Sequence, residues 1–411
     1  MDDFFNVLKV RDFIQILKRS SLLDMKEVPL EEAGNMFAAR DILAGEDLPQ
    51  FTRSCMDGYA VISRETFGAG ESSPAYLENM GEIAVSTVPD FELQPGFCAS
   101  IVTGAALPPG ADSVVMVEHT HDMGGGTIEI RRPVAPGENI MLKGEDMARG
   151  AVAVARGERI TPVRAGVLAA LGVSHVPVFN RPRAGVISSG DELVPVRETP
   201  GPGCIRDVNT YTLRQALEKE GAVVNAGGIV PDSENLLKQA LEQALEENDT
   251  VLISGGSSVG SRDYTIKALE GIQGMEILVH GLALSPGKPT IFARRNQKTV
   301  WGLPGQVTSA MVVLHVLVIP FLRHVQGAGD PFDWSQRLLP AAVLTRNVAS
   351  RYGREDYIRV RVRIKDGQMQ AEPLPGKSGL IITLLEADGL VRIEDNCEGL
   401  LQGQQVTVLP L

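Results

Sequence analysis

The chain has 411 residues, which at about 150 residues per domain predicts a protein of several domains. Hydrophobic residues make up 44% and charged residues 22%, a composition typical of folded soluble proteins and not of disordered ones. The net charge of −12 argues against a protein that binds nucleic acid without sequence preference. It does not exclude an anionic small ligand, because a local pocket can oppose the overall charge.

Cysteine usage and hydropathy favour a cytoplasmic protein. The four cysteines are widely spaced and form no C-x-x-C pair, so neither a zinc ribbon nor a disulfide framework is predicted. The first residues, MDDFFNVLKV, carry acids where a signal peptide needs basic residues. The longest apolar run, 310–322, contains His315 and Pro320 and is shorter than the ~20 residues of a membrane-spanning helix.

The first 177 residues predict a helical unit with a second domain inserted into it. Residues 5–40 are expected to be helical, because apolar residues recur there at intervals of three and four. Short apolar runs such as CASIVTG, SVVMVEH and TIEIRR then alternate with Gly and Pro turns. Helical spacing returns in 147–177. We therefore expect an elongated helical domain of residues 1–41 and 147–177, interrupted by a β-rich domain of residues 42–146.

Residues 178–326 predict a doubly wound α/β domain. Apolar runs such as AGVISSG and TVLISGG alternate with amphipathic segments such as SENLLKQALEQALEEN. Continuous apolar strands between such helices predict a mostly parallel sheet, whose ligands bind at the carboxyl ends of its strands. The fold class is thus multidomain α/β.

Residues 327–411 predict a small C-terminal β domain. Ile358, Val360, Val362 and Ile364 alternate with basic residues at the period of a half-buried strand. The basic residues between them, including Arg359, are expected on a solvated face.

The first candidate site follows a predicted strand, in Ser188-Ser189-Gly190-Asp191-Glu192. Two adjacent carboxylates at a strand's carboxyl end can hold a hard cation or position a water. The alternative is a turn whose Asp caps the next helix. Asp232 is open to the same two interpretations.

The second candidate is the glycine loop SGGSSVG, which follows the next strand and precedes Asp263. Its backbone N–H groups can approach a phosphate or another oxyanion. The loop also matches G-x-S-x-G, so a serine hydrolase with Ser258 as nucleophile and His280, His315 or His324 as base is an alternative. A nucleophile elbow needs a helix directly after the serine, but Gly260 and Ser261 are expected to delay it, and no HGGG-type oxyanion segment is present.

The third candidate is the turn Ser285-Pro286-Gly287-Lys288-Pro289, which presents a lysine able to grip an anion, or which is only a surface turn. Asp57, Thr103 and Asp146 lie in polar turns of the inserted domain that are uninformative one by one.

Taken together, the motifs resemble the molybdopterin molybdenumtransferase family, which is MoeA in bacteria and the E domain of gephyrin in animals. They occur in the family's order: SCMDGYA, TGAALPPGADSVVMVE, KGEDMARG, SSGDEL, DVN, SGGSSVGSRDY, SPGKP and LPG. The likeness covers nearly the whole chain, and its long TGA…VVMVE and SGG…DY blocks are specific.

The resemblance implies the last step of molybdenum cofactor synthesis. Adenylylated molybdopterin is bound, molybdate is placed on its dithiolene, and the phosphoanhydride is hydrolysed with release of AMP. A divalent metal, usually Mg²⁺, is implied. So is a homodimer whose active cleft lies between the doubly wound domain of one subunit and the inserted domain of the other. The adenylyltransferase that makes the substrate is an expected partner; nucleic acid and membrane are not.

Matched residue by residue, the family's functional positions fall on this chain as follows. The catalytic residues are expected to be Asp57, Asp146, Glu192, Asp232 and Asp263. The metal is expected at Glu192, Asp232 and Asp263. The substrate is expected to contact Thr103, Gly255, Gly256, Ser257, Gly260, Lys288, Arg354 and Ser378.

The chain also departs from the family pattern. Ser285 stands where members commonly carry a lysine, and Gly281 or a neighbour stands where an earlier lysine is expected. The segment 306–309, QVTS, replaces the usual Asn-Pro-Val-Ser. Losing lysines removes positive charge that an oxyanion would use. A tungstate-specific enzyme, or a scaffold with weakened catalysis, therefore stays open beside the molybdenumtransferase.

Overall fold

A six-stranded sheet forms the centre of the molecule in this computed structural model, which describes residues 7–255 and 261–411. In spatial order its strands are β16 (Val223–Val230), β13 (Arg183–Ser189), β17 (Thr250–Gly255), β21 (Lys298–Leu303), β20 (Ile291–Arg295) and β18 (Glu276–His280). The first four are parallel to one another, and β20 is antiparallel to both of its neighbours. The expected doubly wound, mostly parallel sheet is confirmed.

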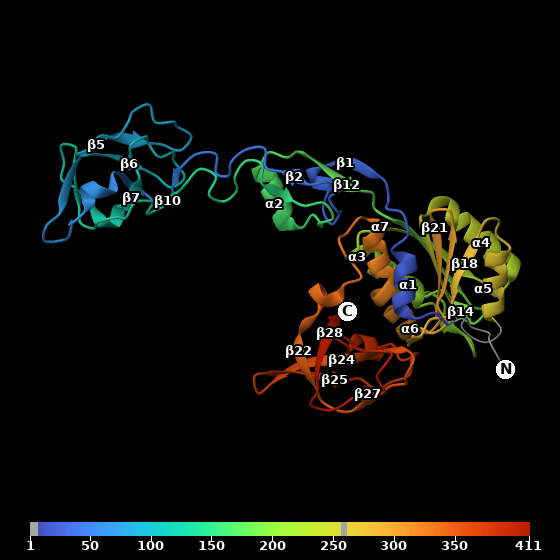
Figure 1. Ribbon diagram of the computed structural model, residues 1–411. Coiled ribbons are helices and arrows are strands. Elements are labelled where there is room, and N and C mark those ends of the chain that lie inside the picture. Colours follow the sequence, from blue (N-terminus) through green and yellow to red (C-terminus); the bar gives the residue numbers. More distant parts are fainter. Residues whose placement is uncertain (1–6, 256–260) are drawn as a thin grey trace.

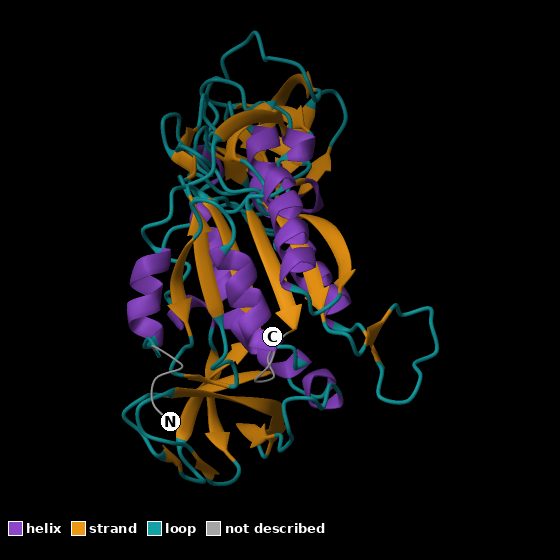
Figure 2. Ribbon diagram, turned by 90° about the vertical axis from the view of Figure 1, so that its right-hand side faces the viewer, coloured by secondary structure: helices purple, strands orange, loops and turns teal. Residues whose placement is uncertain are grey.

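Helices cover both faces of this sheet (Figure 2). They are α1 (Val10–Leu17), α3 (Asn209–Lys219), α4 (Glu234–Glu247), α5 (Ser261–Glu270), α6 (Val307–Val313) and α7 (Ile319–Val325). On one face α1, α3, α6 and α7 share a core in which the rings of Phe13, Phe292, Trp301 and Phe321 meet edge to face. On the other face α4 and α5 close a second core.

The chain from Val307 to Val325 is helical throughout, because the π-helical turn η4 (Leu314–Val318) joins α6 to α7. By length and composition it could cross a membrane, but 78% of its apolar window is buried inside the protein. This helical segment is therefore a core helix of the central domain.

The expectation of a helix over residues 5–40 is right for α1 and wrong beyond it. Residues 25–29 form strand β1 (Met25–Pro29), which pairs with β12 (His175–Phe179), and η1 (Leu30–Glu32) follows. Helix α1 also lies on the central sheet and not in the elongated unit, since its buried face joins the core around Trp301. Helical spacing identifies a buried face, but it does not say which element covers that face.

The elongated unit is built mainly from short strand pairs. Besides β1 and β12 it contains β2 (Ile42–Leu43), β11 (Val152–Val154) and the helix α2 (Pro162–Ala170). Leu168 of α2 is buried, whereas Val163 of the same helix is 77% exposed. Thr161 caps this helix by accepting a hydrogen bond from the Arg164 N–H at 3.3 Å.

The inserted β-rich domain lies at the far end of the elongated unit, well away from the central sheet (Figure 1). Its six-stranded sheet has the order β7 (Ser113–Met116), β4 (Gly58–Val61), β6 (Phe97–Ile101), β5 (Ala75–Ile83), β9 (Thr127–Ile130) and β8 (Thr120–Asp122). The smaller elements are η2 (Ser63–Thr66), η3 (Val117–His119) and the pair β3 (Arg53–Ser54) and β10 (Ile140–Met141). Two chain segments connect this domain to the rest.

The C-terminal domain is a third six-stranded sheet, and it packs under the central domain (Figures 1 and 2). Its strands are β19 (Leu284–Ser285), β24 (Glu355–Lys365), β25 (Gln368–Pro373), β22 (Leu339–Leu344), β28 (Gln405–Pro410) and β26 (Gly389–Ile393). The smaller elements are η5 (Trp334–Arg337), β23 (Val348–Ala349), α8 (Ile382–Leu385) and β27 (Gly399–Leu400). Trp334, Tyr357 and Leu409 join the core that contains α1, so the two domains are packed as one body.

One basic residue of β24 is buried, although it was expected on a solvated face. Arg359 is only 9% exposed, and its Nη2 donates to the Gly376 carbonyl at 2.9 Å. The segment that follows β25 folds back over this arginine.

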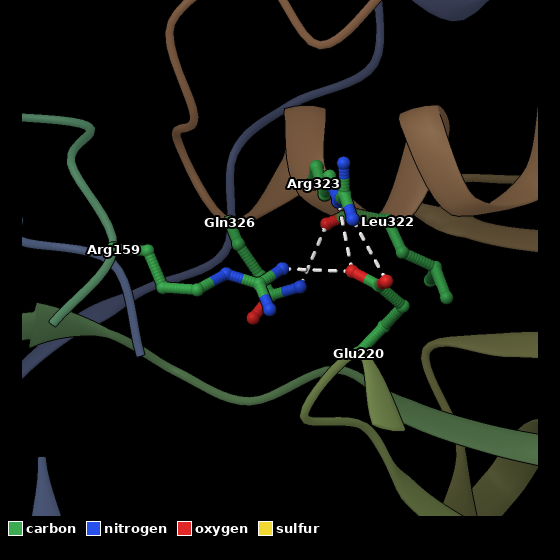
Figure 3. Close-up of polar contacts among 5 residues, drawn as sticks. All are labelled: Arg159, Glu220, Leu322, Arg323 and Gln326. Carbon is green, nitrogen blue, oxygen red and sulfur yellow. Dashed lines mark hydrogen bonds and ion pairs between the residues drawn. The ribbon is translucent and has the colours of Figure 1, made fainter. Parts of the chain in front are cut away.

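A buried ion cluster joins the elongated unit to the central domain (Figure 3). Glu220, at the end of α3, accepts hydrogen bonds from Arg323 at 2.8 Å and from Arg159 of the elongated unit at 2.7 Å. Burial by itself raises the pKa of Glu220, but the bonds and charges of the two arginines outweigh it and lower the pKa to about 2.

Candidate functional site

A pocket of about 340 Å³ opens at the carboxyl ends of the central strands. We call it the strand-end pocket. It lies where ligands of doubly wound sheets bind. Its polar lining comprises Ser189, Glu192, Arg206, Asp207, Asn209, Asp232, Ser254 and Gln306.

The backbone that forms this pocket depends on Gly255, the last residue of β17. Its φ is +123°, and a Cβ placed on it would lie 1.8 Å from the Ser189 carbonyl oxygen. Only glycine allows this conformation together with so close an approach of β17 to β13. The two strand ends thereby meet at the floor of the pocket.

The two carboxylates predicted for this edge both reach the pocket. Asp232 accepts a hydrogen bond from the Ser189 hydroxyl at 2.6 Å, and its own N–H donates to Asp191 at 3.1 Å. Asp191 does not cap the next helix, α3, whose N-terminus has no side-chain cap, and it does not line the cavity. Glu192 and Asp232 do line it. Their oxygens suit a hard cation or hydrogen-bond donors of a ligand.

Beneath them lies a buried polar group that sequence reasoning missed. Asp207 is 6% exposed; its Oδ1 accepts from the Ser188 hydroxyl at 2.9 Å and from the Thr210 N–H at 3.1 Å. Asn209 is 8% exposed; its Nδ2 donates to the Gly305 carbonyl at 2.8 Å, and its buried Oδ1 accepts no hydrogen bond. A buried acceptor without a donor is costly, so Asn209 is a candidate ligand contact.

A second cavity of about 460 Å³ lies between the central and C-terminal domains. We call it the cation cleft, because Lys288 and Arg354 both line it, together with Ser285, Ser309 and Ser378. Arg354 forms an ion pair with Asp356 at 3.1 Å. Arg351 also lines the cleft, and three cations with several hydroxyls suit an oxyanion.

The turn that presents Lys288 again requires a glycine. Gly287 has φ +134°, and a Cβ there would lie 2.7 Å from Val313 and 2.8 Å from Leu284. The turn is therefore packed onto α6 and is not a loose surface turn, which favours the anion-binding interpretation of SPGKP.

The inserted domain, to which three of the predicted residues belong, stands apart from the central and C-terminal domains (Figure 1). Asp57 accepts hydrogen bonds from the Thr103 N–H at 2.7 Å and from the Thr103 hydroxyl at 2.8 Å. These bonds, the backbone one first, lower the pKa of Asp57. Asp146 lies on another segment, where its N–H donates to Leu48 at 3.0 Å. A single chain thus does not unite all the expected site residues.

The remaining predictions fall partly outside the described residues. Gly256, Ser257, Gly260 and the alternative nucleophile Ser258 lie outside them, as does the side chain of Asp263 in α5. Within the part of the chain that the structure describes, no three His, Cys, Asp or Glu side chains are grouped so that they could hold a metal.

The fold and cavities define a class of protein. It is a multidomain α/β protein with the strand-end pocket, an adjoining cation cleft and a projecting arm, which is the β-rich inserted domain of residues 42–146. Family models cover most of the chain. They are the MoeA N-terminal region (domain I and II) at residues 8–172, the probable molybdopterin binding domain at 185–324 and the MoeA C-terminal region (domain IV) at 341–411.

Full-length relatives agree with these models. A putative molybdopterin biosynthesis protein of Methanocaldococcus jannaschii is 35% identical over 98% of this chain and 97% of its own. The molybdopterin molybdenumtransferase of Haemophilus influenzae is 32% identical over 95% of this chain and 97% of its own. A MoeA crystal structure from Pyrococcus horikoshii OT3 superposes with a TM-score of 0.81 at 29% identity, covering 99% of this chain and all of that one. The chain belongs to the MoeA family, as its motifs predicted.

Proposed function

We propose that this protein is a molybdopterin molybdenumtransferase, which inserts molybdate into adenylylated molybdopterin and releases AMP. The observation that carries the proposal is the pair of adjoining cavities, one with carboxylates at the strand ends and one with Lys288 and Arg354. The relatives' names and the molybdopterin-binding family model support it.

The chemistry of each cavity suggests which part of the substrate it takes. A pterin ring carries amino and N–H donors along one edge, which suits the acceptors of Asp207 and Asn209 in the strand-end pocket. Molybdate is an oxyanion, which suits Lys288, Arg354 and Ser378 in the cation cleft. Gly255 lies at the same strand ends, and the glycine-rich sequence that begins with it is assigned to the phosphates.

Mg²⁺ fits the carboxylates present. This ion prefers oxygen ligands and keeps several waters, so one or two protein carboxylates together with substrate phosphates suffice. Glu192 and Asp232 would hold it, with Asp263 as the third expected ligand. When bound, the ion supplies charge neutralisation at the phosphoanhydride.

The inserted domain is assigned to the pocket of a second copy. Asp57, Thr103 and Asp146 belong to the inserted domain, which stands apart from the central and C-terminal domains that form the two cavities (Figure 1). We therefore propose a homodimer in which the arm of each subunit completes the partner's site. The adenylyltransferase that makes the substrate is a proposed partner, and the cytoplasm is the proposed location.

The test is AMP release from adenylylated molybdopterin with Mg²⁺ and either molybdate or tungstate. Molybdate-dependent release is expected. Glu192→Gln should lower its rate by about 100-fold or more, because this carboxylate would hold the Mg²⁺ that neutralises charge at the phosphoanhydride. Glu198→Gln, an exposed carboxylate beyond the short strand β14 (Leu193–Val194), is the matched control and should leave the rate unchanged.

Other outcomes separate the alternatives. Release only with tungstate would identify a tungstate-specific enzyme. Bound substrate without any AMP release would identify a scaffold. Equal rates in Glu192→Gln and in the wild type would refute the assigned role of Glu192.

A further inference from the structure

The strand-end pocket and the cation cleft share a wall. The wall segment, residues 376–381 of the C-terminal domain, places Gly379 and Ile381 in the pocket and Ser378 in the cleft. The start of α6 faces it in the same manner. Gln306 and Val307 line the pocket, and Ser309 lines the cleft.

Thr308 joins the two sides of this wall. Its hydroxyl donates to the Ser378 carbonyl at 2.6 Å, and its N–H donates to the same oxygen at 3.2 Å. Its side chain is fully buried. Thr308 thus connects the central domain to the wall segment by two hydrogen bonds.

The wall segment has little other structure to hold it. It forms no helix or strand between β25 and α8, Lys377 is exposed, and Leu380 is 52% exposed. From its own domain, Arg359 holds Gly376 at 2.9 Å. A segment with few buried contacts opens readily unless it is tied down.

We infer that Thr308 is a positioning residue that fixes the wall between the two ligand cavities. By holding Ser378 it sets the shape of the cation cleft, and through Gly379 and Ile381 it sets the edge of the strand-end pocket. The inference rests on the proposed function only for what the two cavities bind. The anchoring itself is a property of the fold and can be tested without substrate.

The first test is limited trypsin digestion of the full-length protein, with cleavage after Lys377 followed by mass spectrometry. Thr308→Val keeps the shape of the side chain and removes its donor. Cleavage is expected to become about fivefold faster, the change that one neutral hydrogen bond produces. Thr308→Ser keeps the donor and should restore the wild-type rate.

The matched control is Thr299→Val. Thr299 is also buried, and its hydroxyl donates to Thr250 at 2.8 Å, near the opposite end of the parallel strands. This variant loses one buried hydrogen bond of the same domain without touching the wall, so cleavage after Lys377 should stay at the wild-type rate. If Thr308→Val does not fold, comparing Thr308→Ala with Thr308→Ser isolates the hydroxyl, since both lack the methyl group.

The second test is steady-state AMP release. Thr308→Val should raise the KM for molybdate about fivefold and change kcat less than twofold, because the loosened wall weakens binding in the cleft. Equal cleavage after Lys377 in Thr308→Val and in the wild type overturns the inference whatever the kinetics. A wild-type protein that releases no AMP refutes the proposed function, while the digestion still decides the role of Thr308.

Discussion

At the residue scale, Glu220 shows how a buried charge can stabilise a junction between domains. Its carboxylate is paired with Arg323 and Arg159, and together they hold its pKa at about 2 (Figure 3). The same group in the unfolded chain titrates near 4.5. A lowered pKa stabilises the folded state above the unfolded value, and this contribution is lost as the pH falls through the folded value.

We therefore expect Glu220→Gln to lower the free energy of unfolding at pH 7 by about 3 kcal/mol. The difference from the wild type should shrink between pH 4.5 and pH 2 and vanish below that window. Denaturant unfolding followed by tryptophan fluorescence measures it, since Trp301 and Trp334 both lie in the core of the central domain.

Glu218→Gln is the matched control for this experiment. Glu218 forms an exposed pair with Arg214 one turn away, which contributes at most about 0.5 kcal/mol. An equal loss of stability in the two variants would contradict the role given to the buried cluster.

Residue patterns predicted the polar edge of the strand-end pocket but not its buried floor. Glu192 and Asp232 were found because residues that follow parallel strands meet at one edge of the sheet. Asp207 and Asn209 were present in the DVN motif, yet nothing in their spacing showed that packing of α3 would bury them. Burial of a polar side chain depends on tertiary contacts that a linear pattern does not contain.

At the element scale, the close approach of β17 to β13 depends on Gly255. We expect Gly255→Ala to destabilise the central domain by about 3 kcal/mol and to abolish AMP release, because the new Cβ would overlap the Ser189 carbonyl. Gly228→Ala is the control: its φ of +78° is also unfavourable, but no atom lies within 4 Å of its Cβ position. That variant should lose only about 1 kcal/mol. Equal losses in the two would show that backbone conformation alone, and not the close approach, requires Gly255.

The elements of the central and C-terminal domains followed from the sequence more closely than those of the elongated unit. Long apolar strands between amphipathic helices have a distinct period, whereas the strands of the elongated unit are as short as two residues. Short strands are defined by their pairing partners, such as β1 with β12, and these partners lie far away in the sequence. The partner of α1 was missed for the same reason.

At the scale of the whole molecule, the arm separates two sets of site residues that the resemblance assigns to one reaction. Asp57 and Thr103 are hydrogen-bonded to each other within the inserted domain, so this proposed part of the site needs no other domain to form. The strand-end pocket and the cation cleft are lined by the central and C-terminal domains, which lie at the other end of the molecule (Figure 1). The sequence predicted both sets of residues, but the distance between them is a property of the fold.

The most direct test of a site shared between subunits uses two inactive variants, Asp57→Asn and Glu192→Gln. The two are mixed, and AMP release is measured after their subunits exchange. If each arm serves the partner's pocket, half of the dimers are mixed, and each of these contains one intact site. The mixture should then recover about one quarter of the wild-type activity. A mixture as inactive as its two parents would contradict a site shared between subunits.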